Sequence, residues 1–486
     1  MKKDSYIVSV DIGSSGIRGA VFDAEAGIAD GSLFKRTNLL LTSRSASDPG
    51  DFVESVLEVL DEIAAWSEQQ GIYPKAASFS CFWHSLVGID RSLNTSTPLF
   101  DWSETRAAGA AALLGREIDE AAVHNRTGCH FHSSYWPAKL KWIADEFLEE
   151  FENSAYWLSF SDLLNLRLTG RIVTSVSMAS GTGLFDLRNC EWDPEMVRVA
   201  GIRESQLPEI CQDSVSFFLR ADLRERWPAL RDTRFFPAIA DGAANNVGSG
   251  CTDERSAVIM VGTSAAFRVV YEGNIPNSIP EGLFCYRLDS QRPVLGGALS
   301  DGGGLFKWLT EDLGLLVDPR VLKERAENTP GYHGLSMLPL VFGERSTGYH
   351  DEAKGSLIGL TRGSDTADIV LASLEGICFR LKEICERTEI GFSLERIVAA
   401  GGAIESSPVL AKLIADIIGK EIQLSKMSLA SLSGAAIYGL EASGIATPLE
   451  SVGRSGLRTI SPDPDRHREY EKEFSKHRRF YDRMIP

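Results

Sequence analysis

Length, composition and charge limit the class of protein before any motif is considered. The chain has 486 residues, of which 43% are hydrophobic, so it can form two or more domains with sizeable cores. Its net charge of −17 argues against nucleic acid or an anionic membrane as a main partner. Any anionic substrate must therefore be met by local cations.

The chain start and the cysteines bear on the compartment. The apolar run after Ser5 is only as long as a strand and ends at Asp11, too short for a signal peptide or a membrane span. The eight cysteines are scattered, with no Cys-x-x-Cys pair and no histidine spacing suited to zinc. We therefore expect a cytoplasmic protein whose cysteines are free, buried thiols.

The segment Tyr6–Asp23 predicts a β-hairpin with a polar tip at Gly13–Gly16. The glycines allow a tight turn, and the hydroxyls of Ser14 and Ser15 can donate to phosphate oxygens together with the N–H groups of the turn. Asp11 stands just before the turn, and a bridging Mg²⁺ would let its carboxylate share the site with phosphate. A hairpin without a ligand is the alternative.

A second segment, Ser256–Tyr271, repeats this layout about half a chain later. Its turn Gly262–Ser264 aligns with Gly13–Ser15 of the first hairpin. Such a repeat indicates a duplicated protein whose two hydroxyl-lined turns face each other across a cleft, with two unrelated core hairpins as the alternative. Met260 takes the place of Asp11, so only the first turn could hold a metal ion.

Helix and strand signals alternate after the first hairpin, as in an α/β domain. Apolar residues at helical spacing over Asp51–Glu68 predict an amphipathic helix, and Ala76–Phe82 predicts a strand. Two loops rich in aromatic and charged or histidine residues follow, Trp83–Ser85 and Leu99–Arg106. Loops that follow strands are where an α/β fold places ligand groups.

The next stretch is dense in histidine and aromatic residues. His130 and His132 lack a third residue at metal-binding spacing, so a metal site is not favoured. We expect instead a helix capped near Ser133–Ser134, with Pro137 in its first turn.

A second candidate for a functional group is Asp241. Phe236–Gly250 predicts a strand that ends at Asp241, a free backbone at Gly242 and then a helix of small residues. A carboxylate at the carboxyl end of a strand suits a general base. An N-cap of the following helix is the alternative role.

A third candidate is the glycine pair Gly401 and Gly402. A buried strand beginning near Ile397 leads into the pair, and the helix that follows is ended by Gly419. Backbone without side chains could pass here close under a flat ring such as adenine.

Four further segments complete the chain. Leu295–Gly304 predicts a glycine-rich turn, and Gly343–His350 predicts a surface or ligand loop. Ser431–Leu440 predicts a helix of small residues, and the tail from Pro464 predicts an amphipathic surface helix.

Taken together and in this order, the motifs resemble those of the FGGY carbohydrate kinases, relatives of hexokinase and actin in fold. The resemblance covers essentially the whole chain and rests on six linked motifs: Asp11-x-Gly-Ser-Ser-x-x-Arg18, Trp102-Ser-Glu-Thr-Arg106, Asp241-Gly, Gly262-Thr-Ser264, Gly343-Glu-Arg-Ser346 and Gly401-Gly…Ser-Pro408…Ala415-Asp416. The residues around His84 and Asp241, with Arg268, look most like the gluconokinase branch.

The resemblance implies an α/β protein with two ribonuclease-H-like domains, residues 1–245 and 246–486. Each would be a mixed sheet flanked by helices, and ATP with Mg²⁺ would bind in the cleft between them. Asp241 would accept the proton of a substrate hydroxyl as general base, and Asp11 and Asp241 would hold the metal.

The resemblance also assigns residues to the two ligands. The phosphates and adenosine of ATP would be bound by Gly13, Ser14, Ser15, Arg18, Gly262, Thr263, Ser264, Gly401, Gly402 and Ser406. The sugar pocket would contain Trp83, His84, Glu104, Arg106 and Asp241.

The implied activity is ATP-dependent phosphorylation of a small sugar, polyol or aldonate, with gluconate favoured. Trp83 and Ser103–Glu104 depart from the family pattern, and they keep a neutral ketose or polyol open as the alternative acceptor, as in xylulokinases and ribulokinases. A carboxylate substrate would need a cationic partner, and the candidates are Arg106, Lys139 and Arg268.

Other functions stay open within the same superfamily. A phosphohydrolase would use the carboxylate to activate water, and a catalytically silent protein would bind ATP without turnover. The sequence does not decide between a monomer and a homodimer.

Overall fold

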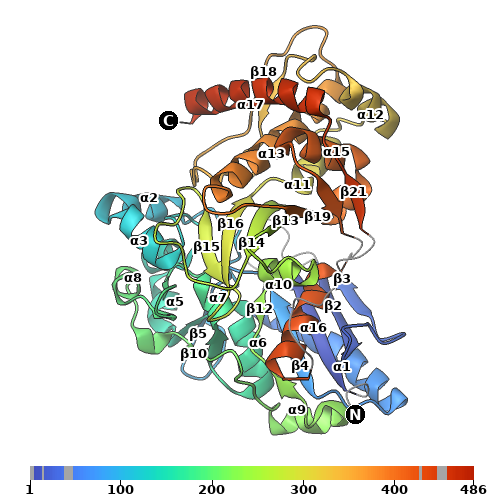
Figure 1. The fold of residues 1–486 in the computed structure, drawn as a ribbon. Helices are drawn as coiled ribbons and strands as arrows, with labels where there is room; N and C mark the ends of the chain where they lie inside the picture. The colour runs from blue at the N-terminus through green and yellow to red at the C-terminus, as the bar shows by residue number, and fades with distance from the viewer. Residues whose placement is uncertain (1–4, 14–15, 38–47, 426–428, 446–456, 486) are drawn as a thin grey trace.

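Two mixed sheets form the centre of the protein. The structure is a computed structural model, and it describes residues 5–13, 16–37, 48–425, 429–445 and 457–485. One sheet lies below the other in the view of Figure 1, and helices flank both of them.

The first sheet is built around the predicted hairpin. Strands β1 and β2 are antiparallel and β3 extends the pair, while β4 runs parallel to β1 and two short strands run parallel to β4. The bounds are β1 Tyr6–Gly13, β2 Gly16–Asp23, β3 Phe34–Thr37, β4 Ala76–Cys81, β11 Arg234–Phe235 and β12 Ile239–Ala240. The hairpin and the strand predicted at Ala76–Phe82 are therefore confirmed.

The second sheet repeats this pairing pattern. Strands β13, β14 and β16 are antiparallel neighbours, and β19 and then β20 run parallel on the other side of β13. The bounds are β13 Ser256–Val261, β14 Ala265–Val270, β15 Phe284–Arg287, β16 Pro293–Leu299, β19 Arg396–Ala400, β20 Ile422–Leu424 and β21 Arg458–Ile460. The duplicated layout predicted from the two turns is thus present in the folded chain.

Helix α1, Pro49–Gln70, packs on the first sheet as its apolar spacing predicted. Asp48 caps it and Gly71 ends it in the left-handed region. Between β4 and β11 the chain adds β5 Val87–Ile89, α2 Ala108–Glu117, α3 Glu120–Thr127, α4 Trp136–Glu146, α5 Leu148–Asn153, β6 Tyr156–Leu158, α6 Phe160–Thr169, β7 Val173–Ser175, α7 Val176–Ser180, β8 Phe185–Asp186, β9 Glu191–Trp192, α8 Pro194–Val199, η1 Glu204–Gln206, β10 Glu209–Cys211, α9 Ala221–Arg226 and η2 Pro228–Leu230.

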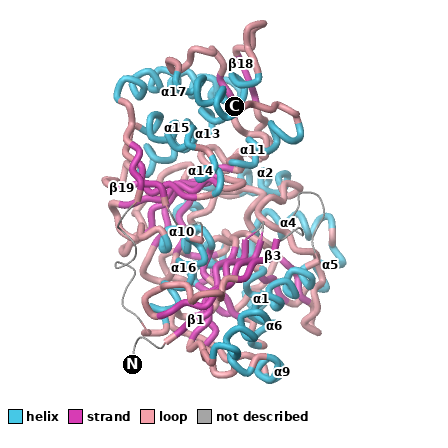
Figure 2. Tube along the Cα trace, turned by 90° about the vertical axis from the view of Figure 1, so that its right-hand side faces the viewer, coloured by secondary structure: helices cyan, strands magenta, loops and turns pink. Residues whose placement is uncertain are grey.

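Helices of the second half surround the second sheet and reach the top of the view in Figure 2. Their bounds, with a small two-stranded sheet, are α11 Gly303–Lys307, η3 Trp308–Asp312, α12 Pro319–Glu327, β17 Ser336–Leu338, β18 Ser356–Ile358, α13 Thr366–Thr388, α14 Gly402–Ser406, α15 Pro408–Ile418 and α17 Pro464–Met484. The predicted tail helix, α17, buries Tyr470, Phe474, His477 and Phe480 along one face.

One helix of the second half packs on the first sheet. Helix α16, Ala430–Ala442, contacts β1, β4 and α10, Asp241–Gly248, and appears in red beside the blue strands in Figure 1. Ser9 on β1 donates to the carbonyl oxygen of Leu432 at 2.7 Å. The domain boundary between residues 245 and 246 stays a prediction, and α16 joins the two halves across it.

The α10–α16 contact requires residues without side chains. A Cβ atom on Gly434 would lie 1.8 Å from the carbonyl oxygen of Ala244, and one on Gly248 would lie 1.9 Å from that of Ala430. Real Cβ atoms do not approach backbone this closely, so the two helix axes could not stay at this distance with larger residues.

One local prediction was wrong, and one alternative role does not apply. Neither Ser133 nor Ser134 caps α4, because Ser133 donates to Asp351 and Ser134 bonds to His132. Tyr135 occupies the N-cap position without a side-chain cap bond, and Pro137 lies in the first turn as predicted. Asp241 is not an N-cap either, since Ala240 occupies that position.

Other expectations are settled by burial. In the loop over residues 343–350, four residues are buried, three are half-buried and one is exposed, which favours a ligand loop over a surface loop. As predicted, the eight cysteines, all within the described ranges, form no disulfide; Cys190 is half-buried and the other seven are buried. No helix in the described part of the chain is both long and apolar enough to cross a bilayer.

Replacing Gly434 with alanine should destabilise the protein. We expect Gly434→Ala to cost about 2 kcal/mol or more, because the clash is with backbone that cannot rotate away. Gly109→Ala in α2 is the matched control, since nothing lies within 4 Å of its new Cβ, and it should be neutral or stabilising by about 0.5–1 kcal/mol. Thermal melting of both variants tests this; equal melting temperatures would contradict it.

Candidate active site

A single cleft of about 2070 Å³ brings the predicted residues of both halves together. Every predicted site residue that the structure describes lines it: Asp11, Gly13, Arg18, Trp83, His84, Glu104, Arg106, Asp241, Gly262, Thr263, Ser264, Gly401, Gly402 and Ser406. Ser14 and Ser15 lie outside the described residues.

Asp11 occupies the end of β1 beside two polar neighbours. Ser80 Oγ on β4 donates to Asp11 Oδ1 at 2.5 Å, and Arg18 Nη1 on β2 donates to Oδ2 at 3.3 Å. Both partners stand directly across from Asp11 in the sheet register. Burial raises the pKa of Asp11, and the bonds from Ser80 and Arg18 oppose that shift.

Asp241 is the first residue of α10, where β12 ends at the cleft. Its Oδ1 accepts a hydrogen bond from the Gly242 N–H at 2.7 Å. Desolvation raises the pKa of Asp241 to about 6, with Arg268 lowering it and Asp11 raising it. Asp241 therefore lies near Asp11, the other carboxylate assigned to the metal.

The second turn packs backbone against backbone on a glycine-rich segment. The N–H groups of Gly303 and Gly304 donate to the carbonyl oxygens of Gly262 and Thr263 at 2.7 and 2.9 Å. A Cβ atom on Gly303 would lie 2.7 Å from the Gly262 oxygen. The predicted glycine-rich turn thus supports the predicted phosphate turn. The sequence did not reveal this contact between the two turns.

The glycine pair that follows β19 lies against the same turn. Gly401 has φ of 107°, and a Cβ atom there would lie 2.4 Å from the Val261 carbonyl oxygen, so only glycine fits without strain. Helix α14 begins at Gly402, and Ser406 is exposed at its end, where Oγ donates to the Ala403 carbonyl at 3.3 Å. The three glycine segments form one side of the cleft.

His84 is held in one tautomer at the other end of the cleft. Its Nδ1 lies 2.6 Å from the Gly181 carbonyl oxygen, which can only accept, so Nδ1 carries the proton. Burial lowers the pKa of His84 well below its usual value, so the ring is neutral and Nε2 is a hydrogen-bond acceptor.

Trp83 is a fixed wall of this pocket. Its Nε1 donates to the Ser177 carbonyl at 2.9 Å, and a Cβ atom on Gly181 would lie 2.4 Å from the indole ring. The indole is also 4.8 Å from the ring of Tyr286. It can therefore offer an apolar face to a ligand but no free N–H donor.

Two of the three predicted carboxylate-binding cations already have partners. Lys139 is fully buried and donates to the carbonyl oxygens of His84 and Asp101, both at 2.6 Å, so its selection was wrong. Burial lowers its pKa to about 7. Arg106 forms a two-point ion pair with Glu104 and lies over Trp142, with its guanidinium 4.6 Å from that ring.

The third cation, Arg268, lies beside Asp241 with unused donors. A Cβ atom on Gly242 would lie 2.7 Å from the guanidinium carbon, so glycine at 242 makes room for the side chain. Among the described residues its guanidinium has no hydrogen-bond acceptor, and Nε and Nη1 are buried. Burial lowers the pKa of Arg268, and Asp241 raises it.

Sequence reasoning missed three side chains of this end of the cleft, Tyr135, Tyr286 and Arg345. The two tyrosines share a hydrogen bond of 2.6 Å between their hydroxyls. Arg345 stacks 4.8 Å from the ring of Trp102, and its Nη2 donates to the Leu299 carbonyl at 2.9 Å. Arg345 belongs to the motif Gly343-Glu-Arg-Ser346, whereas the strand around Tyr286 carries no motif.

The donor set fits a metal ion shared with phosphate. In the described ranges, no group of three or more His, Cys, Asp or Glu side chains could hold a metal ion alone. Asp11 and Asp241 nevertheless line one cleft, and the charge of Asp11 raises the pKa of Asp241. Such a pair suits Mg²⁺, which keeps several waters and takes further oxygens from phosphate.

A cleft between duplicated halves, with glycine-supported turns and paired carboxylates, suits phosphoryl transfer, which depends on positioning and charge neutralisation. Residues 6–226 match the N-terminal domain and residues 257–443 the C-terminal domain of the FGGY family of carbohydrate kinases. The chain belongs to this family. It is therefore a two-domain carbohydrate kinase that uses ATP as co-substrate and a small molecule as acceptor.

The relatives are named for different substrates, among them gluconate, xylulose and glycerol. A gluconokinase of Bacillus subtilis (strain 168) is 26% identical, with 92% of this chain and 90% of the relative covered. A xylulose kinase of Lactococcus lactis is 25% identical, with 96% and 95% covered. A gluconate kinase and a ligand-bound xylulose kinase from Lactobacillus acidophilus each give a TM-score of 0.87 at 25% identity, with 98% of both chains covered.

Proposed function

We propose that this kinase phosphorylates an aldonate, gluconate first of all, at the end of the cleft that holds Asp241. The observation that carries the proposal is a pair of guanidinium groups with unused donors, Arg268 and Arg345. Both line the cleft, and each has a buried Nε without an acceptor among the described residues. Unsatisfied buried donors are costly, so this pocket favours an anionic ligand.

The local charge balance supports an anion as well. Asp241 is the carboxylate that acts on both arginines. Asp301 is also near Arg345, but burial raises its pKa to about 8, so it is protonated at neutral pH. A substrate carboxylate would accept hydrogen bonds from the unused donors of the two arginines.

Glu104 does not oppose this proposal. An unpaired carboxylate there would repel an aldonate, but Arg106 binds both of its oxygens. That pairing lowers the pKa of Glu104 and keeps the pair close to neutral. The neutral Nε2 of His84 would accept a hydrogen bond from an acceptor hydroxyl, which gluconate and a neutral ketose both offer.

The remaining roles follow the family resemblance. Asp241 would take the proton of the attacking hydroxyl, while Arg18, Gly13–Ser15 and Gly262–Ser264 would bind the phosphates of ATP. Gly401, Gly402 and Ser406 would lie by the adenosine. Asp11 and Asp241 would hold Mg²⁺, which when bound neutralises charge on the phosphates.

The role of Asp241 can be tested by an isosteric change. Asp241→Asn should keep the fold and ATP binding but lower kcat by about 10² to 10⁴, the usual contribution of a general base. Glu352→Gln removes an exposed carboxylate from the same cleft and is the control, with kcat expected near the wild-type value. Wild-type turnover by Asp241→Asn would eliminate Asp241 as the base.

Substrate choice can be tested by comparing acceptors on one preparation. We expect kcat/KM for gluconate to exceed that for xylulose and ribulose by tenfold or more, about 1.4 kcal/mol of transition-state preference. A neutral ketose that wins by tenfold would overturn the aldonate proposal and leave the kinase class unchanged.

The role of Arg345 can be tested in the same assay. Arg345→Ala should lower kcat/KM for gluconate by about 10- to 100-fold, the value of a hydrogen bond to a charged group, and affect a ketose much less. Lys354→Ala, an exposed cation of the same cleft, is the control. Equal losses on all acceptors would instead assign Arg345 to the transferred phosphoryl group.

A further inference from the structure

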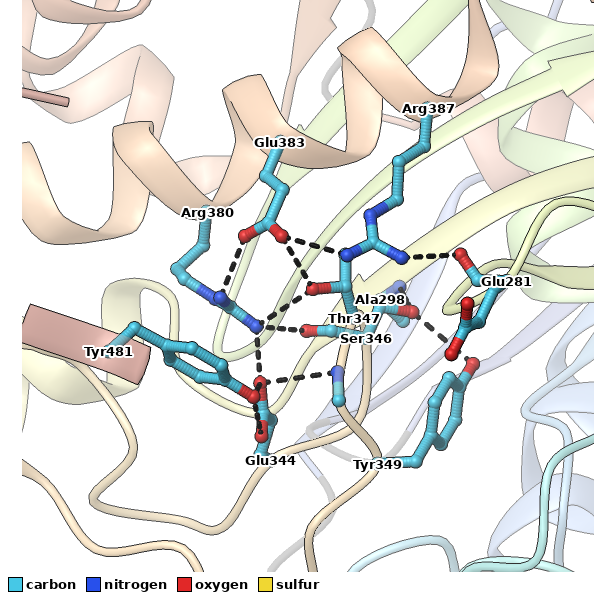
Figure 3. A network of polar contacts seen from close by, with 11 residues as sticks. Glu281, Ala298, Glu344, Ser346, Thr347, Tyr349, Arg380, Glu383, Arg387 and Tyr481 are labelled. Atoms are coloured by element: carbon cyan, nitrogen blue, oxygen red, sulfur yellow. Dashed lines mark hydrogen bonds and ion pairs between the residues drawn. The ribbon is translucent and has the colours of Figure 1, made fainter. Parts of the chain in front are cut away.

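Glu344, the residue before Arg345, bonds to side chains of two helices, as Figure 3 shows. Glu344 is fully buried and accepts hydrogen bonds from Arg380 on α13 and from Tyr481 on α17. The Tyr481 hydroxyl lies 2.9 and 2.8 Å from the two oxygens of Glu344. The Arg380 guanidinium also lies over the Tyr481 ring, 4.6 Å from its centre.

Glu344 and Arg345 serve opposite sides of the loop. Glu344 contacts α13 and α17, whereas Arg345 stacks on Trp102 and lines the cleft. Because the two residues are consecutive, a shift or rotation of the backbone that releases Glu344 must also move Arg345. The Arg345 guanidinium is held directly by Trp102 and the Leu299 carbonyl, and its backbone is held from the other side through Glu344.

Neighbouring residues restrict the loop but leave this dependence in place. Ser346 exchanges hydrogen bonds with Ala298 on β16, its N–H donating at 2.9 Å and its Oγ accepting at 3.0 Å. Thr347 donates to Glu383 at 3.0 Å. These bonds fix the segment after Arg345, and Glu344 is the anchor before it.

We propose that Tyr481 is a positioning residue of the acceptor site, acting through Glu344 to orient Arg345. The proposal makes the end of α17, more than a hundred residues beyond the loop in sequence, part of the machinery that selects the acceptor. It rests on the proposed function only in taking the Arg345 end of the cleft as the place where the acceptor binds.

The test compares two tyrosines of α17. Tyr481→Phe removes the hydroxyl that binds Glu344 and keeps the ring. Tyr470→Phe removes a hydroxyl from the same helix that donates to buried Glu375 at 3.0 Å, without contact to the loop. Steady-state kinetics should use the best acceptor for which Arg345→Ala raises KM, so that the result depends on the role of Arg345 and not on whether that acceptor is gluconate.

We expect Tyr481→Phe to raise KM for the acceptor about three- to tenfold, the scale of one hydrogen bond, with KM for ATP changed less than twofold. Tyr470→Phe should leave both constants unchanged, although it can lower the melting temperature. An unchanged acceptor KM in Tyr481→Phe, or the same change in both variants, would overturn the proposal.

A double-mutant cycle separates positioning from a general structural effect. In an Arg345→Ala background, Tyr481→Phe should no longer raise the acceptor KM, because the side chain that it orients is absent. Additive effects of the two changes would show that Tyr481 acts by another route and would refute the proposal. A wild-type enzyme that phosphorylates a ketose but not gluconate would refute the aldonate proposal alone.

Discussion

The close contact between α10 and α16 is the constraint on which the rest of the structure depends. Gly248 and Gly434 let the two helix backbones touch, so a helix from the second half lies directly on the first sheet. The same contact fixes the start of α10, where Asp241 faces the cleft. The position of the predicted base is therefore set by packing between elements almost two hundred residues apart.

The acceptor end of the cleft holds two arginines with unused donors, although the chain as a whole is acidic. The protein carries a net charge of −17, yet Arg268 and Arg345 meet there with few acceptors. Overall acidity argues against nucleic acid or an anionic membrane as a main partner, while the unused arginine donors suit one small anion. The net charge of the chain therefore bears on macromolecular partners, whereas the charges that line the site bear on its small-molecule ligand.

The sequence by itself determined the features that depend on neighbouring residues. Alternating and helical apolar patterns predicted the two hairpins, α1, α15 and the buried face of α17, because these periods reflect the geometry of strands and helices. Repeated turns at Gly13 and Gly262 predicted the duplication, and the linked motifs predicted the family. Almost all candidate site residues came from those motifs, since a tight turn needs particular residue types.

Only the tertiary structure decided which charged groups are available. Arg106, Lys139 and Arg268 look alike in the sequence, but folding pairs the first with Glu104, buries the second under backbone carbonyls and leaves the third unsatisfied. Tyr286 was missed because its strand carries no motif. A side chain's partners come from distant segments, so its charge state and direction follow from packing that no local pattern records.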